Sequence, residues 1–229
     1  MLITYFLGGE WTFYGITFFI ELFVSELLFL MTQRKKKHFI FRLAGVAVIF
    51  FLMFLFFPPF IQNTFPSLKE NLVAIYSYDT FYFIIIFVIS FLAMMLAFDE
   101  SIWNILFCCV AGYCVQHAVF LIYDVFVIAI NGTGIWKNEF FRFFVEMLLN
   151  IPFYFLFAHR LTKADCINVG SKDIVLFSLS AVIINIILSL WELYDTRTTT
   201  TIVFEELYSI ACSILILFLQ FSVFLKYKI

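Results

Sequence analysis

About seven apolar stretches, each near 20 residues long, follow one another along the chain and are separated only by short polar breaks. A helix of about 20 residues is the length needed to cross a bilayer hydrocarbon core of ~30 Å. In lipid, each backbone N–H and C=O must find its hydrogen-bond partner within the protein, which leaves helices and closed β-barrels as membrane-spanning structures. The predicted spans are continuously apolar and lack the alternation of apolar and polar residues that is typical of barrel strands. The sequence therefore predicts an all-α, multi-pass helical bundle in the cell membrane.

Composition excludes the main soluble classes. Hydrophobic residues make up 64% of the 229 residues, charged residues make up 13%, and the mean hydropathy is +1.05. A soluble domain of this length could not bury so much apolar surface. No basic stripe indicates a nucleic-acid partner, and no linker is long enough for a soluble domain. We expect residues 1–229 to form a single transmembrane domain with spans near residues 11–31, 39–59, 80–97, 102–130, 140–158, 174–191 and 202–225.

The distribution of basic residues predicts the orientation of the bundle. Ten Lys and Arg residues, including the cluster 34–37, fall on one side of the predicted spans, and four fall on the other. Because the side richer in Lys and Arg faces the cytoplasm, the N-terminus is expected outside and the C-terminus inside. An odd number of spans also requires the two termini to lie on opposite sides of the membrane.

Ionisable groups inside the predicted spans are the first candidates for a functional site. Each costs at least ~2.5 to 3.5 kcal/mol on insertion scales, so such groups usually face the bundle interior. Five need an explanation: Glu21, Glu26, His117, Asp124 and Glu146.

The span 102–130 has the richest polar pattern. Tyr113, His117, Phe120 and Asp124 recur at i, i+4, i+7 and i+11, so they share one helix face, and Gln116 lies beside His117. This face is expected to point inward. A rise of 1.5 Å per residue places Gln116 and His117 near the middle of the membrane and Asp124 in its outer half.

Matching depths suggest partners for these residues. Glu21 falls near the depth of His117, and Glu146 falls near the depth of Asp124. The Glu21–His117 pair is interpreted either as a hydrogen bond or shared proton that fixes helix packing, or as part of a ligand site. Asp124 and Glu146 have only Arg142 as a nearby basic residue. Further carboxylates follow at the predicted outer rim, namely Glu139, Glu192, Asp195, Glu205 and Glu206.

An acidic outer mouth of this kind would attract a cationic ligand, and its carboxylates could share a proton and respond to pH. The candidate ligand-binding residues are Tyr113, Gln116, His117, Asp124, Glu146 and Glu21.

Catalytic and cofactor motifs are not found in the sequence. There is no glycine-rich phosphate loop and no His-Glu-x-x-His metal motif, and no cofactor or metal is expected. Cys114 and His117 have a spacing compatible with contact, but His117 is the only group there that could activate the thiol, so a cysteine protease is disfavoured. The five cysteines lack paired spacing and are interpreted as packing residues.

The segment Phe107-Cys108-Cys109-Val110-Ala111-Gly112-Tyr113-Cys114-Val115-Gln116-His117 resembles a motif, approximately F-C-G-x-A-[AG]-Y-x-x-Q-H, in the membrane sensor half of GHKL-type sensor histidine kinases of Gram-positive bacteria. It departs from that motif at Cys109, where a glycine is usual. The residues 214–224 are similar to the last span of those receptors.

This resemblance implies a homodimeric receptor akin to the quorum-sensing Agr-type kinases of two-component systems. Such a bundle binds an extracellular signal, for instance a peptide, and its last helix controls autophosphorylation inside the cell. No kinase motif follows residue 225, so the chain is expected to be a sensor fragment or a member without a catalytic half. The alternative from another class is a small transporter or a substrate-binding integral subunit that uses the same buried carboxylates.

Overall fold

The structure is a computed structural model that describes residues 11–31, 33–64, 72–159, 180, 183 and 207–219. Within these ranges every regular element is helical, and the one β-type contact is an isolated bridge between Lys35 and Phe98. The all-α prediction is confirmed for this part of the chain. The predicted span 174–191 lies outside the described residues apart from Ser180 and Ile183.

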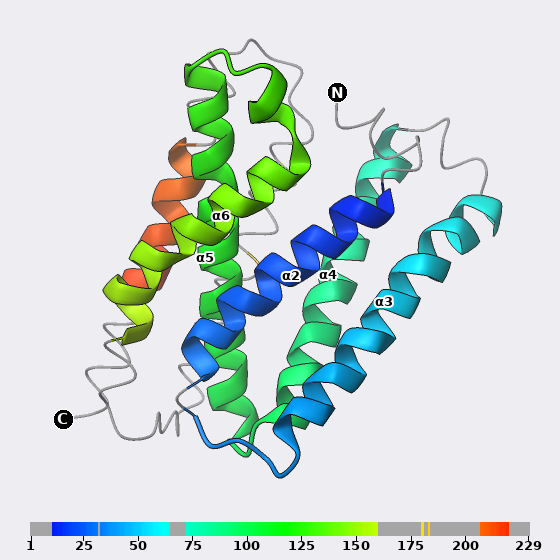
Figure 1. Cartoon of the computed structure of the whole chain (residues 1–229), viewed down its shortest axis with the longest axis vertical. Coiled ribbons are helices and arrows are strands. Elements are labelled where there is room, and N and C mark those ends of the chain that lie inside the picture. Colours follow the sequence, from blue (N-terminus) through cyan, green and yellow to red (C-terminus); the bar gives the residue numbers. More distant parts are fainter. Residues whose placement is uncertain are drawn as a thin grey trace.

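Successive helices run in opposite directions (Figure 1). Two of the described helical stretches, Ile102–Ala129 and Phe140–Phe157, are long and apolar enough to cross a membrane by length and composition. The long helices are α2 (Trp11–Leu30), α3 (Phe39–Thr64), α4 (Leu72–Ala97), α5 (Ile102–Ala129) and α6 (Glu139–Phe153). A short 3₁₀-helix η2 (Gly134–Lys137) precedes α6, a π-helix η3 (Tyr154–Ala158) follows it, and a further helix covers Leu207–Leu219.

Two predicted boundaries are wrong. The second span was expected to end at Pro58–Pro59, but α3 continues to Thr64. The third was expected to begin at Thr80, but α4 begins at Leu72. A proline removes one backbone donor and distorts the helix locally without always ending it. The apolar residues that begin α4, Leu72 to Ile75, fall in the segment 60–79 that was expected to lie between two spans.

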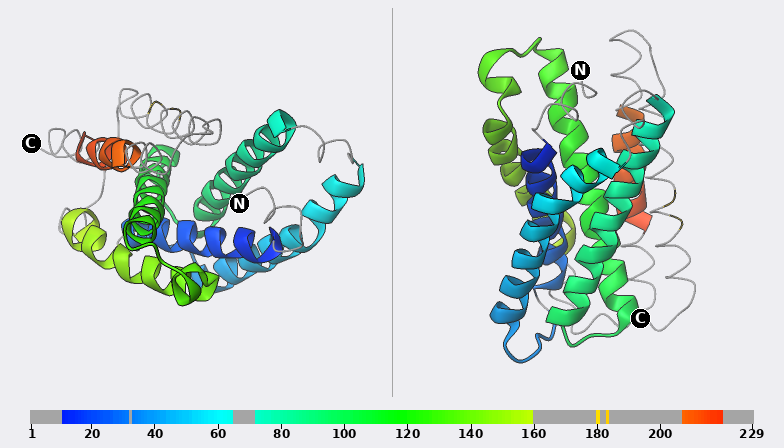
Figure 2. Two further views of the ribbon diagram at one scale, coloured as in Figure 1. Left: turned by 90° about the horizontal axis from the view of Figure 1, so that it is seen from above. Right: turned by 90° about the vertical axis from the view of Figure 1, so that its right-hand side faces the viewer.

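Helix α5 forms the centre of the bundle, with α2 and α6 packed on one side and the helix Leu207–Leu219 on the other (Figure 2). Almost every side chain of α5 from Asn104 to Leu121 is buried. Gly112 marks the closest approach to α2, because a Cβ atom added there would lie 2.6 Å from both the Cα and the backbone N of Glu26. The two backbones can meet at this distance only because Gly112 has no side chain.

Both ends of α5 carry local signals that the sequence contains. The Ser101 hydroxyl caps the first turn by accepting a hydrogen bond from the Asn104 N–H at 3.2 Å. At the other end Asn131 has a positive φ of 48°, and the Gly132 N–H donates to the Val127 carbonyl at 2.9 Å. This is the hydrogen-bond pattern of a Schellman cap. Asn and Gly are the residues that most readily adopt such a turn, and the chain has them at these two positions.

The helix of α6 does not end at Pro152 but continues as the wider π-turn η3. A proline ring clashes with the carbonyl four residues earlier, here that of Leu148, and a π-turn can accommodate the disturbed hydrogen bonds. At this level the Phe157 ring meets Phe218 edge-on, with centroids 5.2 Å apart. Ile216 and Leu217 of the same C-terminal helix are buried in the core formed by α5.

Candidate functional site: a polar cluster between α2, α5 and α6

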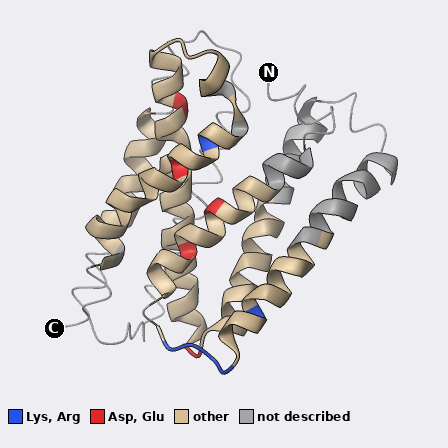
Figure 3. Ribbon diagram, viewed as in Figure 1, with Lys and Arg blue, Asp and Glu red and all other residues tan. Residues whose placement is uncertain are grey.

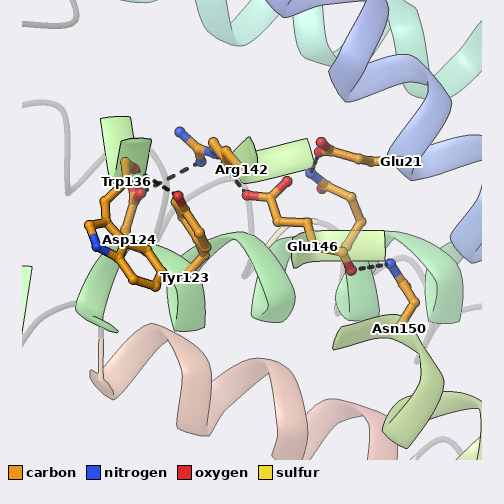
Figure 4. A network of polar contacts seen from close by, with 8 residues as sticks. Glu21, Tyr123, Asp124, Trp136, Arg142, Glu146 and Asn150 are labelled. Carbon is orange, nitrogen blue, oxygen red and sulfur yellow. Dashed lines mark hydrogen bonds and ion pairs between the residues drawn. The ribbon is translucent and has the colours of Figure 1, made fainter. Parts of the chain in front are cut away.

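Arg142 is the centre of a polar cluster in an otherwise apolar interior (Figure 4). Its Nε lies 2.8 Å from Oε1 of Glu146 one turn further along α6, and its Nη2 lies 3.6 Å from Oδ1 of Asp124 on α5. The guanidinium also stacks over the Phe120 ring, 4.0 Å from its centroid. Asp124 and Glu146, which were expected to pair at one depth, are linked through Arg142, which contacts both of them.

Glu21 brings α2 into the same cluster. Its Oε2 accepts a hydrogen bond from the Gln116 side-chain amide at 3.5 Å, and its carboxyl interacts with the carboxyl of Glu146 and with the charge of Arg142. Only 6% of Glu21 and 1% of Glu146 is exposed, whereas a third of the Asp124 side chain is accessible. The cluster therefore has a buried end and an accessible end.

Further hydrogen bonds beside this cluster join α2 to α6. The Ser25 hydroxyl donates to Oδ1 of Asn150 at 3.0 Å, and Nδ2 of Asn150 donates to the Glu146 carbonyl at 2.9 Å. The sequence interpretation missed Ser25 and Asn150. Their spacing could have predicted them. Ser25 follows Glu21 by four residues and Asn150 follows Glu146 by four, so each lies on the same helix face as the preceding glutamate.

The expected pairing of Glu21 with His117 is not what the structure has. Successive residues of a helix point about 100° apart, so only one of Gln116 and His117 can face α2, and Gln116 does so. The His117 ring instead stacks parallel to Tyr113, with centroids 6.2 Å apart. His117 Nε2 is buried and has no hydrogen-bond partner among the described residues. Tyr113 packs edge-on against Phe87 of α4.

Glu26 belongs to a separate site. It follows Glu21 by five residues, which turns it toward α4, where its fully buried carboxylate accepts a hydrogen bond from the Ser90 hydroxyl and interacts with the Cys109 thiol. The side chains of the predicted outer rim, Glu139, Glu192, Asp195, Glu205 and Glu206, lie outside the described residues.

The thiols and possible metal ligands were also located. Cys108, Cys109 and Cys114 are buried in the core around α5, as expected for packing residues. In the part of the chain that the structure describes, no group of three or more His, Cys, Asp or Glu side chains could hold a metal ion. What the cluster can do chemically is bind a cation or a proton, because it has three carboxyl groups and one guanidinium, which contacts two of them directly.

Comparisons of the chain with protein-family models, with characterised proteins and with solved structures find no match.

Proposed function

We propose that the chain is a transmembrane sensor module of the kind that precedes the kinase half of GHKL-type sensor histidine kinases. In this proposal it crosses the membrane seven times, with its N-terminus outside. The cluster of Glu21, Asp124, Arg142 and Glu146 receives an external signal, and the C-terminal helix transmits it to a cytoplasmic kinase domain. The signal is a cationic ligand, for example a peptide with a basic group.

The observation that carries this proposal is the joining of three helices by charged groups inside an apolar bundle. Because each such group is costly in hydrocarbon, a cluster of this kind usually marks a site or a switch. Asp124 is its accessible member, and it holds Arg142 at 3.6 Å, a longer contact than the 2.8 Å of Arg142 with Glu146. An external cation would compete with Arg142 for Asp124. Losing that contact would loosen α5 from α6.

The route to the cytoplasm runs along α6. Glu146 and Asn150 lie on the helix that continues into η3, and Phe157 of η3 contacts Phe218 of the C-terminal helix. A ligand can shift the C-terminal helix only if it binds one arrangement of these helices more tightly than the other. Competition at Arg142 would supply that difference.

A chimera provides the test of the sensor proposal. The chain is fused to the kinase half of a characterised GHKL-type receptor, and autophosphorylation is measured in membranes for Asp124→Asn and Arg142→Gln. Asp99→Asn is the matched control, because Asp99 is an exposed carboxylate between α4 and the start of α5, whereas Asp124 lies near the end of α5. Both site variants should change the basal output, while the control should not. Unchanged output in correctly inserted site variants would remove the assignment.

The seven-crossing topology has its own test. A reporter that is active only outside the cytoplasm is fused after residue 36 and, in a second fusion protein, after residue 133. Activity is expected only for the second fusion, since the two turns lie at opposite ends of the described helices (Figure 1). The reverse pattern would contradict the proposed orientation.

Transport is the second candidate. It is favoured by His117, whose Nε2 is buried without a hydrogen-bond partner among the described residues, because such a group could carry a proton or contact a solute within the bundle. Proteoliposomes that contain the purified chain discriminate between the two functions. Solute or proton uptake that is abolished by His117→Phe would favour transport over signalling.

A further inference from the structure

A basic surface lies at the end of the bundle opposite the accessible Asp124, where α2 and α4 end and α3 and α5 begin (Figure 3). Among the described residues, five cations gather there against two carboxylates. The cations are Arg34, Lys35, Lys36, Lys37 and Arg42, and the carboxylates are Asp99 and Glu100.

Two of these cations are bound inside the fold. Nζ of Lys36 donates to the Met95 carbonyl at 2.8 Å, and Nη1 of Arg42 donates to the Leu96 carbonyl at 3.0 Å. These carbonyls belong to the last turn of α4, where helical hydrogen bonds are missing and a positive charge is favourable. Lys36 and Arg42 therefore cap α4. A third cation, Arg34, is paired with Glu100 at 3.2 Å.

Lys35 and Lys37 are not bound in this way. Lys35 lies in the extended bridge to Phe98 and Lys37 in the turn before α3, so neither is held against the end of α4 as Lys36 is. Both are exposed, and Nζ of Lys35 lies 5.3 Å from the centroid of the Phe39 ring, which keeps its ammonium group beside the start of α3. The first turn of α3 also presents Ile40 and Phe41, each 77% exposed. Two outward lysines thus lie directly beside two outward apolar side chains.

We propose that this surface, defined by Lys35, Lys37, Ile40 and Phe41, binds anionic phospholipids of the inner leaflet. The two ammonium groups contact the headgroup phosphate, and Ile40 and Phe41 contact the acyl chains just above it. Each lysine near an anionic membrane surface contributes about 1 kcal/mol. The inference rests on the proposed membrane crossing, which places the ends of four helices at headgroup depth.

The test measures lipid preference directly. The full chain is reconstituted in phosphatidylcholine, extracted in mild detergent, and titrated with short-chain phosphatidylglycerol or phosphatidylcholine while native mass spectrometry records the bound lipids. Phosphatidylglycerol should bind more tightly. The double variant Lys35→Gln with Lys37→Gln should weaken its binding about 30-fold, since ~2 kcal/mol corresponds to that ratio at 1.4 kcal/mol per tenfold.

Three controls make the result decisive. The double variant Lys35→Arg with Lys37→Arg should retain the preference. Lys36→Gln should lower the thermal stability of the chain and change the lipid preference by less than about threefold, because this lysine is bound to α4. Inorganic phosphate, at the concentration at which phosphatidylglycerol saturates the site, should not compete.

Equal binding of the two lipids, equal losses for all three lysines, or competition by inorganic phosphate would overturn the proposal. A chain that fails to insert into phosphatidylcholine would contradict the membrane crossing instead.

Discussion

The close approach of α2 and α5 at Gly112 predicts a large effect of a single added methyl group. In Gly112→Ala the new Cβ would lie 2.6 Å from two backbone atoms of Glu26, roughly 1 Å closer than van der Waals contact allows. Because backbone atoms cannot rotate away, α2 and α5 must separate. Overpacking of this kind costs about 3 kcal/mol. The higher helix propensity of alanine stabilises the variant by ~1 kcal/mol, so the free energy of unfolding should fall by about 2 kcal/mol in total.

Gly45→Ala is the matched control. Gly45 lies within α3, and a Cβ added there meets no atom within 4 Å. The same chemical change should therefore only add helix propensity and stabilise the chain by up to ~1 kcal/mol. The two variants are predicted to shift stability in opposite directions.

The buried thiols of α5 provide the assay. Cys108, Cys109 and Cys114 are buried in the folded chain, so a thiol-reactive dye reports their exposure as the detergent-solubilised protein is heated. A loss of 2 kcal/mol corresponds to a fall in Tm of about 4–8 °C for a chain of this size. A Gly112→Ala variant as stable as Gly45→Ala would refute the close approach of the two helices.

Three further predictions follow from the polar contacts. Arg142→Met should destabilise the chain by ~3 kcal/mol because it leaves the buried Glu146 without its counter-charge, and adding Glu146→Gln should recover much of the loss in the same thermal assay. A double-mutant cycle of Ser25→Ala and Asn150→Leu should give a coupling of about 0.6 kcal/mol, and zero coupling would contradict their hydrogen bond. Asn131→Val should cost about 1 kcal/mol or more because of the positive φ, whereas Asn131→Gly should be tolerated, as judged by Tm.

The polar face of α5 is the part of this site that the sequence predicted best. Helical periodicity is sufficient to place Tyr113, His117 and Asp124 on one side of a helix, and the structure buries the first two and joins Asp124 to α6. Depth counting assigned Asp124 and Glu146 to each other, whereas in the structure Arg142 links them and Glu146 also interacts with Glu21.

The partner of Glu21 could not be obtained in the same way. Depth does not distinguish Gln116 from His117, which differ by one residue and about 1.5 Å but point in different directions. The choice depends on the rotation of α5 about its axis, and that rotation is fixed by the contact of Gly112 with the backbone of α2. A pairing that depends on such tertiary contacts is not available from a hydropathy pattern.

The π-turn after Pro152 gives α6 an uneven stiffness along its length. Hydrogen bonds of the regular i to i−4 pattern resist bending, and η3 interrupts that pattern immediately before Phe157 touches the C-terminal helix. The stretch of α6 that carries Arg142 and Glu146 should move as a rod, while the turn below it absorbs curvature. A tilt of this part of α6 should therefore displace Phe218 only slightly, because η3 bends. Replacing Pro152 with alanine should make this segment stiffer and increase the displacement of Phe218 for the same tilt.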